Sequence, residues 1–130
     1  DRIGHPAIVS GSSMYPTLEG AKPSLWERDI IWLSTMSIHN PTLGNVMTFI
    51  SPRDPKKVLI KRVTAVEGNL VRRKPNCELY IVPEGHCFME SDNETKETND
   101  SHRFGPVSYG LMQARATHII WPPNRWRTIK

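Results

Sequence analysis

Proline and glycine occur along the whole 130-residue chain, which contains 11 prolines and 8 glycines. Proline disrupts helix interiors and both residue types favour turns, so this distribution argues against long helices. The chain must instead form short segments joined by turns. Its length suits one domain, and a hydrophobic share of 38% is sufficient for a packed core. We therefore expect one domain over residues 1–130.

The segments between the turns have the composition of β-strands. They are short, rich in Val, Ile, Phe and Trp, and bounded by turn pairs such as Gly44-Asn45 and Ser51-Pro52. Residues 109–116 fit either a helical turn or a strand. Strands at this spacing predict a mainly β fold, an antiparallel sheet system or barrel with little helix. The predicted strands are 29–33, 46–50, 58–66, 70–73, 79–82, 86–89 and 117–121.

Charge is unevenly distributed although the net charge is only +4. Residues 51–74 carry eight basic and two acidic side chains, whereas residues 84–100 carry six acidic side chains and one basic one. A solvated surface of uneven sign and a basic patch facing an anionic membrane are both consistent with this pattern. The charge permits nucleic acid as a partner without requiring it.

Cysteine and histidine give no sign of a metal site or another cofactor. Cys77 and Cys87 are ten residues apart, which fits no zinc spacing, and the five histidines are scattered. One disulfide and two free thiols are both open. No apolar run exceeds four residues, so nothing in the chain predicts a membrane span. The chain begins at Asp1, and we expect that a preceding targeting or membrane segment has been removed.

Residues 10–17, with the sequence SGSSMYPT, are the first candidate for chemistry. Gly11 permits a close backbone approach and Pro16 favours a turn. Serines on such a segment can be exposed beside backbone N–H groups that point into a cleft. The pattern by itself is also typical of an ordinary serine-rich turn.

Lys61 is the second candidate. In a strand over 58–66, alternation places Leu59, Lys61, Val63 and Ala65 on one face. Burial among apolar side chains would lower the lysine pKa from about 10.4, and a neutral lysine can act as a general base. An edge position, or an amine that reaches solvent, would leave the lysine charged. Together with a serine, a neutral lysine forms a nucleophile and base pair that requires no histidine.

Four segments of the chain resemble the motifs of type I signal peptidases. Residues 10–17 resemble the S-G-x-S-M-x-P-T box, and residues 61–69 are similar to the K-R-V-x-A-x-x-G-D box. Residues 91–93 with 100–101 resemble the G-D-N…S-x-D-S-R box, and residues 83–86 match the segment before it. The four segments follow the order of the family and cover most of the chain.

Three further segments are similar to the mitochondrial inner membrane protease branch, and to its subunit 2 type rather than subunit 1. They are residues 51–55, 104–108 and 121–126. This resemblance implies an endopeptidase that removes sorting sequences from precursor proteins delivered to the intermembrane space. It also implies an inner-membrane location, an N-terminal anchor absent from this chain, and subunit 1 as a heterodimer partner, with no nucleic acid and no cofactor.

The resemblance assigns roles to individual residues. Ser13 is implied to be the nucleophile and Lys61 the general base, with the Ser13 backbone N–H contributing to the oxyanion hole. Some bacterial relatives add a serine hydroxyl two positions before the nucleophile, where this chain has Gly11. Met14 and Tyr15 are expected either to line a shallow apolar substrate groove or to act as ordinary packing residues.

The last motif departs from the family. Ser91 replaces its first glycine, and the lysine-orienting serine falls on Thr98. The arginine expected after Asp100 is His102, with Arg103 one position late, so the resemblance suggests supporting roles for Thr98 and for an Asp100–Arg103 pair. These departures motivate an alternative function: a catalytically silent β module that partners an active sister subunit or binds anionic lipid.

Two N-glycosylation sequons bear on the compartment. They begin at Asn93 and Asn99. In the secretory pathway they could carry sugar beside the last motif, whereas a mitochondrial protein would leave them bare.

Overall fold

The computed structural model describes residues 4–36, 38–73, 78–93 and 99–129. Cys77 and Thr98 lie outside the described residues. Short 3-10 helices occur at Leu25–Glu27 (η1), Tyr109–Leu111 (η2) and Pro123–Arg125 (η3), and one α-helix, α1, at Ser101–Phe104. The strands are β1 (Gly4–Ile8), β2 (Ile30–Ser34), β3 (Val46–Ile50), β4 (Val58–Val66), β5 (Leu70–Arg73), β6 (Glu78–Ile81), β7 (His86–Glu90), β8 (Val107–Ser108), β9 (Met112–Trp121) and β10 (Arg127–Thr128).

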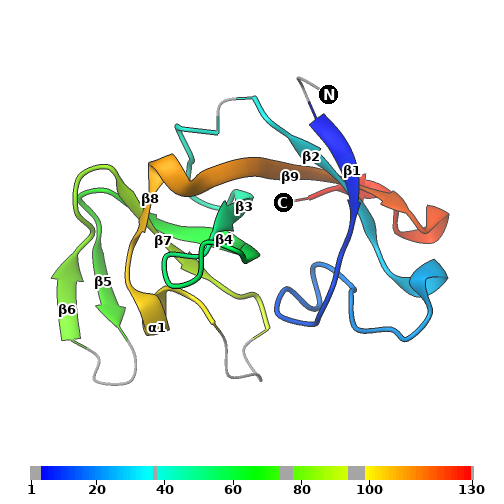
Figure 1. Ribbon diagram of the computed structural model, residues 1–130, viewed down its shortest axis with the longest axis horizontal. Coiled ribbons are helices and arrows are strands. Elements are labelled where there is room, and N and C mark those ends of the chain that lie inside the picture. The colour runs from blue at the N-terminus through cyan, green and yellow to red at the C-terminus, as the bar shows by residue number, and fades with distance from the viewer. Residues whose placement is uncertain (1–3, 37, 74–77, 94–98, 130) are drawn as a thin grey trace.

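The strands form one large and one small antiparallel sheet. The order in the large sheet is β1-β2-β9-β3-β4-β7-β8, with β10 paired to β9, while β5 and β6 form a separate two-stranded sheet. Figure 1 shows β9 crossing the middle of the molecule, with the β5–β6 hairpin at one end and β1 and β2 toward the other. The prediction of a mainly antiparallel β fold with little helix is therefore confirmed.

Strand β4 carries the lysine selected from the sequence. It pairs with β3 from Val46↔Arg62 to Ile50↔Val58, which sets Lys61 opposite Met47. Of the four side chains that the alternation placed on one face, Lys61, Val63 and Ala65 are buried and Leu59 is half-buried, so the buried alternative holds for the lysine. The lysine therefore points toward the protein interior and not toward the exposed face of the strand.

Three hydrophobic clusters lie against the sheets. Strand β3 contributes Val46 to the first cluster and Met47 and Phe49 to the second, because successive side chains of a strand point to opposite faces. The first cluster also contains residues of β2 and β9, and the second those of β7 and β8. The third is small and comprises Ala65, Val82 and Phe88.

The predicted strands agree with the structure to within one residue, apart from the last. The predicted strand 117–121 is the second half of β9, which begins at Met112. The ambiguous segment 109–116 contains both alternatives, since η2 is followed directly by the start of β9. Strand β1 was not predicted. It contains Pro6 and lies at a sheet edge, the usual place for a proline in a strand.

Cys87 is a free, buried thiol whose Sγ lies 3.5 Å from Met89 Sδ. Burial raises the pKa of this thiol to about 12, so the sulfur stays protonated at neutral pH. Of the two alternatives for the cysteines, the free thiol holds for Cys87. In the described part of the chain no group of three or more metal-ligating side chains gathers, and no helix is both long and apolar enough to cross a membrane.

Candidate active site

Residues 9–20 form a loop, called here the serine loop, between β1 and η1. Its two ends meet where Gly11 N donates to Gly20 O at 3.0 Å. A Cβ on Gly20 would lie 2.6 Å from both Gly11 O and Val9 Cγ1, so only glycine permits this approach. Gly11 has φ +83°, a left-handed conformation that glycine adopts without strain. The sequence thus closes the loop with two glycines whose roles differ.

The loop is anchored in the first hydrophobic cluster by two apolar side chains. Met14 and Leu18 are almost completely buried, and Leu18 N donates to Met14 O at 2.9 Å in a single turn. Tyr15 is 49% exposed, whereas Ser13 is half-buried. Met14 is therefore a packing residue of the core, and Ser13 lies between the core and the exposed side of the loop.

Lys61 is only 4% exposed in the centre of β4. Burial lowers the pKa of its amine from the ordinary value of 10.5, and the nearby Asp100 carboxylate opposes part of this change. Among the described residues, the structure gives the Lys61 side chain no hydrogen bond or ion pair. This amine therefore loses its proton more readily than an exposed lysine, as a general base requires.

The segment after β7 is bonded to the serine loop on both sides of its nucleophile candidate. Asn93 N donates to Ser13 O at 2.9 Å, and Asn93 Nδ2 donates to Ser12 O at 2.8 Å. Thr17 Oγ1 donates to Asp92 Oδ2 at 2.6 Å. The third motif thus fixes the backbone of the first.

The same segment is bonded to β4 beside the lysine. Arg62 Nε donates to Asp92 Oδ1 at 2.9 Å, and Arg62 Nη2 donates to Asp92 Oδ2 at 2.8 Å. Arg62 Nη1 also donates to Gly44 O at 2.7 Å. The hydrogen bond to Asp92 raises the pKa of Arg62 further, so the guanidinium remains charged. Residues 92 and 93 therefore connect the loop that carries Ser13 to the strand that carries Lys61.

Asp100 is 3% exposed and is the N-cap residue that precedes helix α1. Its Oδ1 accepts from His102 N at 3.0 Å, and its Oδ2 accepts from Ser91 N at 3.3 Å. Ser101 Oγ accepts from Met89 N at 2.8 Å, which ties the start of α1 to β7. The carboxylate thus has a structural function in addition to its electrostatic effect on the lysine.

The expected pair between Asp100 and Arg103 is not formed: the ion pairs among the described residues do not include it. Arg103 is exposed, and its carbonyl accepts from Arg53 Nη2 at 3.0 Å and from Arg73 Nη2 at 3.1 Å. The physical reason is helix capping, because the Asp100 carboxylate is directed at His102 N in α1 and at Ser91 N. Thr98, the other expected supporting residue, lies outside the described residues.

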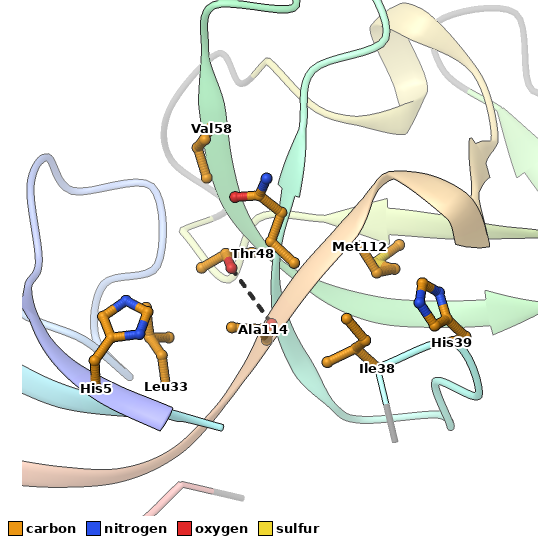
Figure 2. Close-up of a pocket in the computed structure, with 9 residues that line it drawn as sticks. His5, Leu33, Ile38, His39, Thr48, Val58, Met112 and Ala114 are labelled. Carbon is orange, nitrogen blue, oxygen red and sulfur yellow. Dashed lines mark hydrogen bonds between the residues drawn. The ribbon is translucent and has the colours of Figure 1, made fainter. Parts of the chain in front are cut away.

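A cavity of about 510 Å³ opens beside β1, the strand that precedes the serine loop. Neither Ser13 nor Lys61 lines this cavity. One lining residue, Val58, is three residues before Lys61 in β4, which is a distance of roughly 10 Å along an extended strand. Figure 2 shows His5 and His39 at opposite sides of the cavity, with Thr48 and Ala114 between them. Five strands each contribute a lining residue: His5 of β1, Leu33 of β2, Thr48 of β3, Val58 of β4 and Ala114 of β9.

The sequence motifs contain several connecting residues to which sequence reasoning gave no role. Thr17, Arg62, Asp92 and Asn93 all belong to the matched boxes. The available signal was their place in these boxes, since Thr17 and Arg62 share the boxes of the candidate serine and lysine and Asp92 and Asn93 belong to the third. Which of them contact one another depends on the pairing of β4 with β7, and the sequence does not specify that pairing.

Comparison with known proteins places these features in a family. The family model described as "Signal peptidase, peptidase S26" matches residues 2–81. The mitochondrial inner membrane protease subunit 2 of Danio rerio is 38% identical over the whole chain, which covers 71% of the relative. The Mus musculus subunit 2 is 39% identical, again over the whole chain and 74% of the relative. Subunit 1 from Mus musculus is 32% identical over 92% of the chain and 71% of the relative.

Proposed function

Because this chain belongs to the signal peptidase family (peptidase S26), we propose that it is a serine endopeptidase with Ser13 as nucleophile and Lys61 as general base. The observation that carries the proposal is the burial of Lys61, which lowers the pKa of its amine. A lysine placed for solubility or lipid binding would be exposed. The bonds from residues 92 and 93 to both the serine loop and β4 support the same assignment.

The proposed reaction follows from these groups. Neutral Lys61 takes the proton of Ser13 as Oγ attacks the scissile carbonyl. The lysinium then gives that proton to the leaving amine, and water hydrolyses the acyl-enzyme. The Ser13 backbone N–H is one donor to the oxyanion. A second donor from a side chain at position 11 is absent, since this residue is a glycine with positive φ.

The substrate is proposed to bind as an extended strand. Among the described strands, β1 pairs with β2 alone, and β4 pairs with β7 only from Arg62 onward, so residues 58–61 have one free edge. An extended peptide can add to such edges through main-chain hydrogen bonds. The cavity at Val58 offers space for a larger side chain upstream of the cut.

We further propose the location, the partner and the substrates of this chain by analogy with its relatives. Those relatives are named as subunits 1 and 2 of a mitochondrial inner membrane protease. By analogy, this chain acts at the inner membrane with its catalytic domain toward the intermembrane space. There it removes sorting sequences from precursors as the heterodimer partner of subunit 1.

A serine-reactive acylating probe tests the proposal in the full-length protein assembled with subunit 1. We expect labelling at Ser13, its loss in Ser13→Ala and Lys61→Met, and unchanged labelling in Ser10→Ala, an exposed serine of the same loop. Cleavage of a presequence peptide should likewise be lost in Ser13→Ala and Lys61→Met and be unchanged in Ser10→Ala. Full labelling and cleavage by folded Lys61→Met would exclude the lysine base, whereas folded wild-type protein that binds anionic lipid without labelling would favour the silent β module.

A further inference from the structure

Asp29 is a completely buried carboxylate that the proposed mechanism does not use. It precedes β2, and its side chain is paired with Arg125 of η3 by two bonds. Arg125 Nε donates to Oδ1 at 2.7 Å, and Arg125 Nη2 donates to Oδ2 at 2.9 Å. Such a two-point contact fixes the direction of both side chains as well as their separation.

The same aspartate contacts both ends of the serine loop. Glu19 N donates to Asp29 Oδ2 at 2.9 Å, and Asp29 N donates to Glu19 O at 2.7 Å. At the other end of the loop, Val9 N donates to Asp29 O at 2.9 Å. Asp29 is therefore a common anchor for the residues that enter and leave the loop.

Residues 123–128, which include η3 and β10 and are called here the C-terminal segment, also contact the serine loop at Thr17. Arg125 Nη2 donates to Thr17 O at 3.3 Å, and Arg127 Nη2 donates to it at 2.9 Å. The Thr17 hydroxyl is the group that binds Asp92. Thr17 is thus held by arginines of the C-terminal segment through its carbonyl and by the third motif through its hydroxyl, four residues after Ser13.

We propose that Asp29 and Arg125 are positioning residues that hold the serine loop in the register at which Ser13 can react. This inference rests on the proposed function. A fixed loop is required because displacement of a nucleophile by about 1 Å is sufficient to lower a rate on the order of 100-fold. Residues of the C-terminal segment are on this account part of the active-site support, although they touch no reacting atom.

A purely structural pair would give a different result. It would change the folded fraction but leave the turnover of the folded molecules unaltered. A positioning pair lowers kcat or the acylation rate of folded protein, with little change in KM, because the extended substrate binds to strand edges elsewhere. The two interpretations therefore separate when kinetics are measured well below the unfolding temperature.

The test uses the full-length protein assembled with subunit 1 and the acylating probe together with a presequence peptide. We expect Arg125→Gln to lower kcat and the acylation rate at least about 10-fold with KM within about 3-fold, while Arg125→Lys, which keeps the charge but loses the planar two-point contact, recovers part of the rate. Arg28→Gln is the matched control, since Arg28 Nε donates to a loop carbonyl, that of Lys22, at 2.7 Å. It should remain as active as wild type.

Unchanged kcat in folded Arg125→Gln, or an equal loss in Arg28→Gln, would overturn the inference. If Arg125→Gln does not fold, Arg127→Gln provides the test instead. Arg127 is exposed and contacts Thr17 O but not Asp29. A reduced acylation rate in Arg127→Gln supports positioning through Thr17, and an unaltered rate contradicts it. Inactive wild-type protein would instead refute the proposed function itself, so the two failures are distinguishable.

Discussion

The carboxylate of Asp92 is bonded to Arg62, the residue directly after Lys61, at 2.8 and 2.9 Å. It also accepts the Thr17 hydroxyl at 2.6 Å, so one side chain joins the strand of the lysine to the loop of the serine. The Arg62 and Asp92 side chains are only 18% and 16% exposed. A charge pair of this kind is screened less than a surface pair, and the loss of one member leaves the other without compensation.

Asp92→Asn should therefore impair both catalysis and stability. The amide cannot accept both arginine bonds and the threonine bond as a carboxylate does, so the serine loop loses its connection to β4. We expect kcat for a presequence peptide to fall at least about 10-fold and the free energy of unfolding to fall by about 1–3 kcal/mol. Steady-state kinetics and denaturant unfolding measure the two effects.

Asp54→Asn is the control for this substitution. Asp54 accepts from Lys56 N at 3.0 Å within a turn and contacts neither the serine loop nor Arg62. It should have wild-type kinetics. Equal activity of Asp92→Asn and Asp54→Asn would show that the Asp92 connection is not needed for turnover.

The pH dependence of the acylation rate should report the ionisation of the Lys61 amine. The reaction requires the neutral amine, and burial lowers the pKa of Lys61 below 10.5. The acylation rate should therefore rise with pH through a single ionisation whose midpoint lies below that value. A probe reaction followed from pH 5 to beyond pH 10.5 would measure the midpoint of this rise, and a midpoint at or above 10.5 would contradict a buried base.

Stability should respond to the same group with a defined sign. Between the lowered pKa of folded Lys61 and its ordinary value, the unfolded chain binds more protons than the folded one. The free energy of unfolding attributable to Lys61 therefore increases as pH rises through this window. Lys61→Met should remove this contribution to the slope and be more stable than wild type at neutral pH. Chemical denaturation of both proteins at several pH values provides the measurement.

Gly11→Ser should not supply the oxyanion donor found in some bacterial relatives. Gly11 has φ +83°, and a residue with a side chain is strained in this conformation by about 1–3 kcal/mol. We expect a loss of stability of this size without a gain in acylation rate. Gly110→Ser is the comparison, because Gly110 has no positive φ and a Cβ there would meet only Ser108 Oγ at 3.6 Å. A faster Gly11→Ser enzyme would disprove this account.

Val58→Trp should reveal whether the cavity binds the upstream part of the substrate. Val58 is 56% exposed and lines the cavity, so a large side chain there would partly fill it. We expect KM to rise at least about 3-fold for peptides that extend well upstream of the cut and to stay constant for short ones. Leu70→Trp, at a 66% exposed position of β5, should leave both values unchanged. Identical KM values for long peptides in the two variants would exclude the cavity as a binding site.

Local pattern was sufficient to predict β4 and the face of the strand on which Lys61 lies, but it left open whether the amine is buried. Alternation along a strand is a property of neighbouring residues, and Lys61, Val63 and Ala65 occupy the buried face as expected. Helix capping is also local, yet the role of Asp100 as the cap of α1 was not predicted. The family pattern suggested an arginine partner for Asp100, and the capping geometry leaves Arg103 exposed instead.

Contacts between distant parts of the chain could not be predicted from local sequence pattern. Asp29 and Arg125 are 96 residues apart, and each is unremarkable among its neighbours. Only the pairing of β2 with β9 brings the two segments together. The aspartate was placed at the start of a strand from its sequence context, but burial of its carboxylate depends on that tertiary arrangement.

The place of β9 in the large sheet also has a consequence for the order in which the molecule is made. β9 lies between β2 and β3 in the sheet but follows both of them in the chain. A nascent polypeptide that ends before Met112 therefore contains Ser13 and Lys61 but lacks the strand that joins β1 and β2 to β3 and β4. A nonsense codon ahead of β9 would be expected to leave both side chains in a polypeptide that cannot form the large sheet.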